Sequence, residues 1–479
     1  MPNSPNARSH IRIFSKALFK QTKICYNEHN NINGKAWYNI MNHTLFAGAG
    51  WADTTPEVGG MLYGYNDNTY STSCHDPLEI KALALRSGDA APILMMSFAL
   101  ADFGTSCCTQ TREAVARECG IPFEHVIASS THTHSAPNCA GQAGWGDVDR
   151  PYLEGILIPG AVKAAKEALA SLQPAEFAVV WGESEVGVNR REITIDGRSG
   201  FGQNVWAPQD KTMTIIRFRN IETKEGIFQF IHYGCHGTAA GNNHEISRDW
   251  IGIMTDRMGT ETGIPTGFWN GCVGDIGPRI ANGLTTGDIR HVEELGGRAA
   301  LDAIRIAGQF AHTPFECAPV TLHAEEIALP VRPLPARETV ETYMNTHDRD
   351  GHYVNIDGLI HAYMCDAYDM YVSGQTLPTE KLLPVSVVTL GDAVSFCPTP
   401  YELFSEICLR IRDHGPCRHN LAMSLTNGYE AYLPSESALC RGGYEVECFM
   451  YGNVAALGDN TDTVLIRHFV RILSAMKRT

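Results

Sequence analysis

From residue 45 onward, short continuous apolar runs alternate with segments of helical spacing. Residues 93–98 and 126–130 are apolar runs of the length that is typical of buried strands. Residues 110–119 between them have an amphipathic helical pattern, and Gly120, a common helix-ending residue, follows. A strand–helix–strand unit of this kind predicts that its two strands are parallel.

Two further pairs of apolar runs are joined by short polar turns and predict β-hairpins. The pairs are 213–219 with 227–233 and 385–390 with 393–397. Since hairpin strands are antiparallel, the whole pattern predicts an α/β fold with a large mixed sheet flanked by helices. Residues 152–172 predict a long helix interrupted at a Pro-Gly pair, 159–160, and the polar, irregular residues 345–382 predict an insertion or lid.

The first 42 residues differ from the rest of the chain. Up to residue 40 they carry six Lys or Arg and a single acidic residue, Glu28, with an Asn-rich stretch at 27–34. We expect a flexible leader or a wrongly assigned start, with a short surface helix over 11–20 and a transit peptide as alternatives. Residues 43–479 are then expected to form one catalytic domain.

Composition and charge exclude several classes of protein. The chain has 479 residues, of which 44% are hydrophobic and 19% charged, as in ordinary globular proteins. A net charge of −15 argues against non-specific binding to nucleic acid or to anionic membranes. No apolar stretch is long enough to span a bilayer, and the first residues lack the apolar core of a secretory signal, which favours a cytoplasmic protein.

Fifteen scattered cysteines without a CxxC pair favour reduced thiols over a disulfide framework. Most of them lie in apolar runs, and we expect those, such as Cys397 and Cys408, to be small core residues.

A pair of histidines follows the 126–130 strand. Residues 129–137 read SSTHTHSAP, so His132 and His134 are two positions apart. On a strand, such residues point to the same face, and the carboxyl end of a parallel strand is where open α/β sheets bind ligands. Neutral imidazole is a preferred zinc ligand, so the pair is a candidate metal site. One core histidine beside one exposed histidine is the alternative.

Three other apolar runs end in residues of the same chemistry. They lead to His236, Glu402 and Tyr432, respectively. His236 could instead cap a loop, and Glu402 could be a first-turn glutamate of a helix running to Arg412. Asp102 and Asp249 follow similar patterns, and we expect them to make structural hydrogen bonds.

Together these segments resemble the catalytic domain of the neutral/alkaline non-lysosomal ceramidases, which are zinc amidases. The motifs that carry the resemblance are AGAGWADTTP at 47–56, the histidine motif at 129–137, Asn189-Arg190, Asp210-Lys211, HGT at 236–238 and GDIGP at 274–278. Six motifs in the same order identify a family far more specifically than a single motif does. No GxSxG nucleophile elbow and no Walker A motif compete with this interpretation.

The resemblance implies a set of site residues. The implied ligands of Zn²⁺ are His132, His236, Glu402 and Tyr432, with Tyr429 as the nearest alternative to Tyr432. The residues implied around the substrate carbonyl are His134, Arg190 and Tyr444. Zinc with such ligands lowers the pKa of bound water to about 7, and His134 could pass a proton to a leaving amine.

The chain departs from the ceramidase pattern at Gly277, where the family carries a serine that contacts substrate. Asp275 and Gly277 are the residues expected on the substrate side. We also expect the chain to be without the C-terminal immunoglobulin-like domain of the family. We therefore expect zinc-dependent hydrolysis of an amide that is smaller or more polar than ceramide. A genuine ceramidase, a zinc lyase or isomerase, and a non-catalytic zinc-holding protein are the alternatives.

Overall fold

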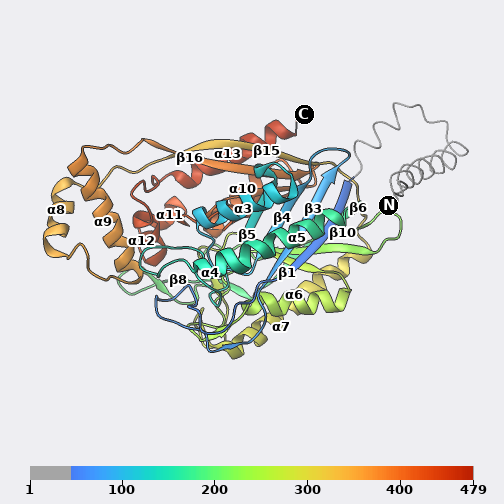
Figure 1. Cartoon of the computed structure of the whole chain (residues 1–479), viewed down its shortest axis with the longest axis horizontal. Helices are drawn as coiled ribbons and strands as arrows, with labels where there is room; N and C mark the ends of the chain where they lie inside the picture. The colour runs from blue at the N-terminus through green and yellow to red at the C-terminus, as the bar shows by residue number, and fades with distance from the viewer. Residues whose placement is uncertain (1–44, 478–479) are drawn as a thin grey trace, which may run out of the picture.

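The computed structural model describes residues 45–477, so the predicted leader lies outside the described residues. An eight-stranded sheet forms the centre of the molecule (Figure 1). In spatial order its strands are β13 (Thr266–Asn270), β11 (Gly226–Tyr233), β10 (Thr212–Asn220), β6 (Gln173–Glu183), β1 (Leu45–Asp53), β3 (Glu79–Ser87), β4 (Ile93–Phe98) and β5 (Val126–Ser130). The β4–β5 and β11–β13 pairs are parallel and the others antiparallel, which confirms the predicted mixed sheet.

A second, four-stranded sheet packs on one face of the central sheet. Its strands, in order, are β15 (Val320–Pro330), β16 (Glu380–Leu390), β17 (Val394–Pro398) and β19 (His419–Met423). Aromatic side chains from both sheets, including Phe230, Trp269 and Phe396, form one apolar core between them. The two predicted hairpins are confirmed as β10–β11 and β16–β17.

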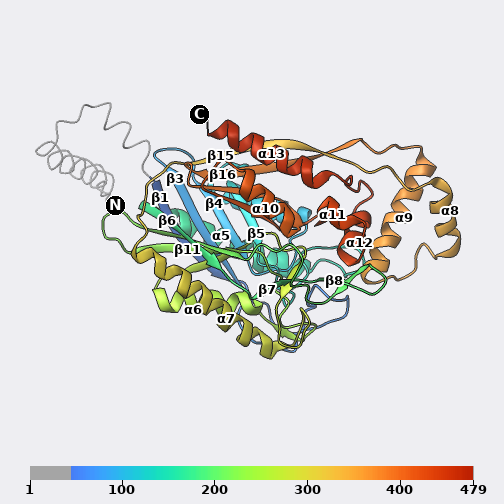
Figure 2. The same cartoon turned by 180° about the vertical axis from the view of Figure 1, so that it is seen from behind.

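Helices cover the two outer faces, giving four layers in the order helix, sheet, sheet, helix (Figure 2). The helices on the central sheet are α3 (Thr105–Cys119), α5 (Ile158–Ala170), α6 (Asp249–Thr262) and α7 (Ile289–Ala307). Those on the second sheet are α10 (Ser405–His414) and α13 (Thr461–Met476). Cys397 of β17 and Cys408 of α10 lie in the core between the second sheet and its helices, as predicted. No helix among residues 45–477 is long and apolar enough to cross a membrane.

Helix α5 approaches the central sheet very closely. A Cβ atom on Gly50 of β1 would lie 2.0 Å from the carbonyl oxygen of Ala164, so only glycine allows this contact. The predicted long helix forms as α4 (Arg150–Tyr152), a π-helical turn over Leu153–Leu157 and then α5. The chain therefore stays helical near the Pro-Gly pair, and the expected break is a change from a π-helical turn to an α-helix.

Much of the region predicted to be irregular, residues 345–382, is helical, so that part of the prediction was wrong, while its role as an insertion or lid stays a prediction. Helices α8 (Arg337–Thr346) and α9 (Asn355–Ser373) pack against each other and form one end of the molecule (Figures 1 and 2). The buried side of α9 includes His361 and Tyr363 besides Leu359, and such mixed polarity hides the helical pattern in the sequence.

Candidate metal centre

The two edge strands of the central sheet meet at their carboxyl ends. The eight-stranded sheet curves, and the strands at its two edges, β13 and β5, are in contact. There the side-chain amide of Asn270 donates to the carbonyl oxygen of Thr131 at 2.8 Å. Just beyond, Thr133 forms a parallel bridge with Gly237, which places the two histidine segments side by side.

His132 and His134 lie beyond strand β5, not on it. His132 has a φ of 71°, in the left-handed region that few residues other than glycine adopt. The chain turns there, and the two imidazole rings lie edge to face with centroids 4.8 Å apart. The pair projects together as expected, but strand alternation is not the reason.

Glu402 and Tyr432 come from two short strands that pair in parallel, β18 (Tyr401–Leu403) and β20 (Ala431–Leu433). The two residues are direct register partners, so their side chains lie on the same face. Glu402 therefore does not lie in the first turn of a helix, since α10 begins at Ser405.

Four side chains converge at this point. Glu402 Oε2 lies 3.3 Å from His132 Nε2 and 3.1 Å from His236 Nε2. His236 Nε2 lies 3.3 Å from Tyr432 Oη. All four residues are almost completely buried.

The orientation of the two imidazoles fits a cation between them. His236 Nδ1 lies 2.9 Å from the carbonyl oxygen of Ile276, and His132 Nδ1 lies 3.1 Å from Asp102 Oδ1. With Nδ1 of each ring donating to these acceptors, each Nε2 presents a lone pair to the Glu402 carboxylate. Acceptors that face one another at such distances in a buried site need a positive charge between them. Two imidazole nitrogens, a carboxylate and a phenol oxygen suit zinc, which prefers nitrogen, oxygen and sulfur ligands.

Two other groups of residues that could hold a metal ion share members with these four side chains. His134 joins His132 and His236 in a group whose ligand atoms all lie within 4.8 Å of one another, and Asp102 does so with His132 and Glu402. Neither ring nitrogen of His134 has a hydrogen-bond partner among the described residues. Asp102 instead accepts a hydrogen bond from Tyr63 at 3.1 Å, which fits its expected structural role.

The electrostatics of the cluster favour an ionised Glu402 carboxylate, a neutral His236 and a charged His132, which places one positive charge beside the carboxylate. Burial alone would raise the pKa of Glu402, but the charge of His132 and hydrogen bonds from both histidines hold this pKa well below its usual range. Burial lowers the pKa of His236 to about 3, with help from the charges of Arg190 and His132. Burial would also lower the pKa of His132, but Glu402 and Asp102 outweigh it and raise that pKa to about 10.

Arg190 links the cluster to a buried ion-pair network. Its Nη2 donates to Tyr432 Oη at 2.9 Å, and its Nε donates to Glu445 at 2.8 Å. The second oxygen of Glu445 accepts from Arg191. Glu445 is the first residue after Tyr444 in α12 (Tyr444–Tyr451), so this network also fixes the helix that carries Tyr444.

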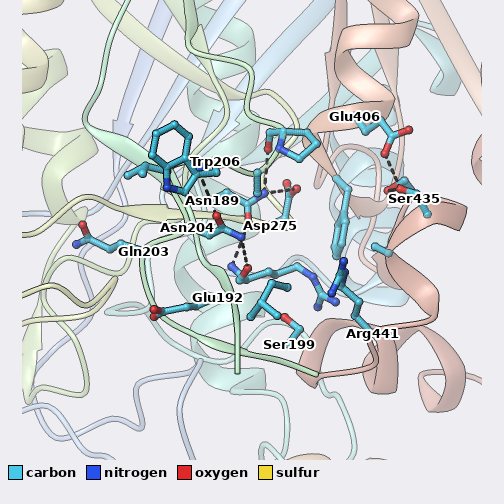
Figure 3. Close-up of a pocket in the computed structure, with 18 residues that line it drawn as sticks. Asn189, Glu192, Ser199, Gln203, Asn204, Trp206, Asp275, Glu406, Ser435 and Arg441 are labelled. Atoms are coloured by element: carbon cyan, nitrogen blue, oxygen red, sulfur yellow. Dashed lines mark hydrogen bonds between the residues drawn. The ribbon is translucent and has the colours of Figure 1, made fainter. Parts of the chain in front are cut away.

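A cavity of about 650 Å³ lies beside this network and is a separate pocket (Figure 3). Asp275 lines it together with Asn189, and the Asp275 carboxylate accepts hydrogen bonds from Asn189 Nδ2 at 2.9 Å and Ser405 N at 2.8 Å. Burial raises the pKa of Asp275 to about 6. The predicted substrate-side carboxylate therefore lines this cavity and not the one described next.

A second cavity, of about 440 Å³, is lined by one of the four metal-ligand candidates, Tyr432. It brings together Tyr432 and all three residues predicted around the substrate carbonyl, namely His134, Arg190 and Tyr444. Tyr429, the alternative to Tyr432, does not line it and packs against Val273 and Leu425 in the core.

Several lining residues were not predicted from the sequence. They are Tyr65, Trp145, Phe201, Thr285 and Asn355, which come from loops, from β9 (Ser199–Phe201) and from the start of α9. None lies in a motif, so no signal in the sequence marks them. The α8–α9 region thus contributes to the cavity through the beginning of α9.

Two solved ceramidase structures superpose on this chain. A neutral ceramidase from Pseudomonas aeruginosa matches with a TM-score of 0.69 and 17% sequence identity, over 91% of this chain and 75% of that chain. A structure of a ceramidase complexed with C2 matches with a TM-score of 0.70 and 16% identity, over the same shares. No model of a protein family matches the sequence, and no curated protein does. The chain therefore has the fold of the neutral ceramidases, as the sequence motifs predicted.

Proposed function

We propose that this protein is a zinc-dependent hydrolase that cleaves an amide bond. The observation that carries the proposal is the convergence of His132 Nε2, His236 Nε2, Glu402 Oε2 and Tyr432 Oη in a buried site beside a cavity. The fold agrees, because both structures compared with it are ceramidases.

The four converging residues would hold the zinc ion. When bound, zinc supplies a water molecule of lowered pKa and polarises a carbonyl group. Each proposed histidine ligand also has a partner at its other ring nitrogen. Asp102 orients His132, and the Ile276 carbonyl oxygen orients His236. Such contacts fix the ring orientation and the tautomer of a metal-binding histidine.

Arg190 and Tyr444 are suited to stabilise charge on a carbonyl oxygen. Both line the cavity, and Nη1 of Arg190 makes no hydrogen bond with the described residues. The other nitrogens of this guanidinium are held by Glu445 and Tyr432, so the group is fixed before a substrate arrives. Donors fixed in this way stabilise charge in the transition state without reorganisation.

His134 is suited to transfer a proton to the departing amine. Its ring lies beside the candidate ligands, lines the cavity and has no hydrogen-bond partner at either nitrogen. An edge contact from Tyr65, with ring centroids 5.2 Å apart, holds the ring in place.

We propose a substrate that is smaller or more polar than ceramide. The cavity wall combines aromatic groups, such as Trp145 and Phe201, with three threonines, Thr238, Thr285 and Thr286. Ceramide itself is the competing substrate, because both compared structures are ceramidases.

The test is a substrate screen with the purified full chain. The substrates are amides with acyl chains of two to sixteen carbons, the matched esters and a fluorescent long-chain ceramide. Each is incubated with the native protein, with the chelator-treated protein and with the chelator-treated protein to which zinc has been returned. We expect amide hydrolysis that is lost with chelator, restored by zinc and greatest on short or polar amides. Efficient cleavage of long-chain ceramide would favour a genuine ceramidase, and turnover that chelation leaves unchanged would reject the metal mechanism.

A further inference from the structure

Thr285 lies directly over Gly277. A Cβ atom at position 277 would lie 2.6 Å from Thr285 Cβ and 3.0 Å from its Cγ2, much closer than carbon atoms pack. Gly277 lies in β14 (Ile276–Pro278) and does not have a positive φ, so it is required for space and not for conformation. A threonine at 285 in this position therefore excludes a side chain at 277.

The loop that carries Thr285 is fixed from two sides. Gln203 donates through its side-chain amide to the carbonyl oxygens of Ile280 and Leu284, at 2.7 Å each, and Figure 3 shows its position. Thr238 Oγ1 donates to the carbonyl oxygen of Thr285 at 3.2 Å. The Thr285 side chain is thus held in a defined place at the cavity wall.

The hydroxyl of Thr285 is available to a ligand. The residue is only 5% exposed, and it lines the same cavity as His134, Arg190 and Tyr444. Its Oγ1 makes no hydrogen bond with another group between residues 45 and 477, although hydroxyls in such surroundings are normally paired. A molecule in the cavity would be its natural partner.

We infer that Thr285 is a specificity-determining residue of this site. Its hydroxyl binds a polar group of the substrate next to the scissile amide, and its methyl group narrows the cavity above Gly277. This inference rests on the proposed amide hydrolysis. It also means that the site has a hydroxyl group although residue 277 is a glycine, because Thr285 supplies one from another loop.

The first test compares two probe substrates, a short N-acyl amino alcohol and the matched N-acyl amine without the hydroxyl. Thr285→Val keeps the shape and removes the hydroxyl, and Thr285→Ser keeps the hydroxyl. We expect Thr285→Val to lower kcat/KM for the amino alcohol about tenfold, with little change for the amine, because one hydrogen bond is lost. Thr285→Ser should stay within about threefold of the native chain for the amino alcohol.

The matched control is Thr339→Val, at an exposed position of α8. Equal effects of Thr285→Val on both substrates, or no effect on either, would overturn the inference while leaving the proposed hydrolysis intact. Absence of any amide turnover by the native chain would reject both.

The second test measures packing and needs no substrate. Gly277→Ser should lower the Tm by several degrees, because the new side chain collides with Thr285, and adding Thr285→Ala should restore most of the loss. An unchanged Tm in Gly277→Ser would show that the two positions do not exclude each other, which overturns the inference. The double variant also moves the hydroxyl from 285 to 277, so we expect it to regain part of the preference for the amino alcohol.

Discussion

Glu402 and Tyr432 are register partners in a parallel pair of strands only three residues long. This pairing places a carboxylate and a phenol on one face, opposite the two histidines that follow β5 and β11. The four proposed ligands thus come from four separate segments that pair through backbone hydrogen bonds, β18 with β20 and Thr133 with Gly237.

Removal of one histidine should distinguish the possible ligand sets. We expect His132→Ala to lose both bound zinc and activity, whereas His134→Ala should keep zinc and lose activity, because His132 contacts the Glu402 carboxylate and His134 does not. Zinc content by atomic absorption, measured beside the rate, checks this. Loss of zinc in His134→Ala would instead support the three-histidine group.

Asp102→Asn should weaken metal binding without removing a proposed ligand. Asp102 lies 3.1 Å from His132 Nδ1, and partners of this kind typically change metal affinity by about 10- to 100-fold. Competition with a chromophoric chelator gives the Kd for zinc. An unchanged Kd would mean that Asp102 does not orient the imidazole.

Glu445→Gln should destabilise the protein strongly. Glu445 is the shared acidic partner of two buried arginines, Arg190 and Arg191, and the loss of one member of a buried ion pair costs about 3–5 kcal/mol. Urea unfolding measures the loss. The control is Glu447→Gln, which removes a partly exposed partner at 3.7 Å from Arg198 and should cost at most about 1 kcal/mol. Equal effects of the two variants would contradict the network.

The pH dependence of stability should reveal the buried Asp275. Its pKa is raised from 3.8 to about 6 by burial, so the folded state holds this proton more tightly than the unfolded state. The stabilisation is fully present only at a pH below the unfolded pKa of 3.8 and is lost as the pH rises through about 6. Relative to Asp275→Asn, which does not titrate, the native free energy of unfolding should fall by about 3 kcal/mol between about pH 3 and about pH 7. A constant difference between the two proteins would contradict the raised pKa.

The sequence predicted the parts of the site that follow long apolar runs. Strand β5 and its two histidines could be located because a continuous apolar run marks a buried strand. The alternative that placed Glu402 in the first turn of a helix stayed open because a three-residue strand such as β18, paired with residues about thirty positions away, leaves no periodic pattern. The left-handed turn at His132 was also not visible, since its backbone angle depends on contacts with distant segments.

Thr285 could not be predicted at all. Its importance arises from its contact with Gly277, and the loop between them bears no motif. The same holds for Asn355, whose place in the cavity depends on how α9 packs.

The most direct test of the central claim is an anomalous diffraction map at the zinc edge from a crystal of the protein. We predict one strong peak among His132, His236, Glu402 and Tyr432, at about 2.0–2.1 Å from each Nε2. A crystal grown with zinc that has no peak at this point, or a peak bound by His134 and remote from Glu402, would contradict the account.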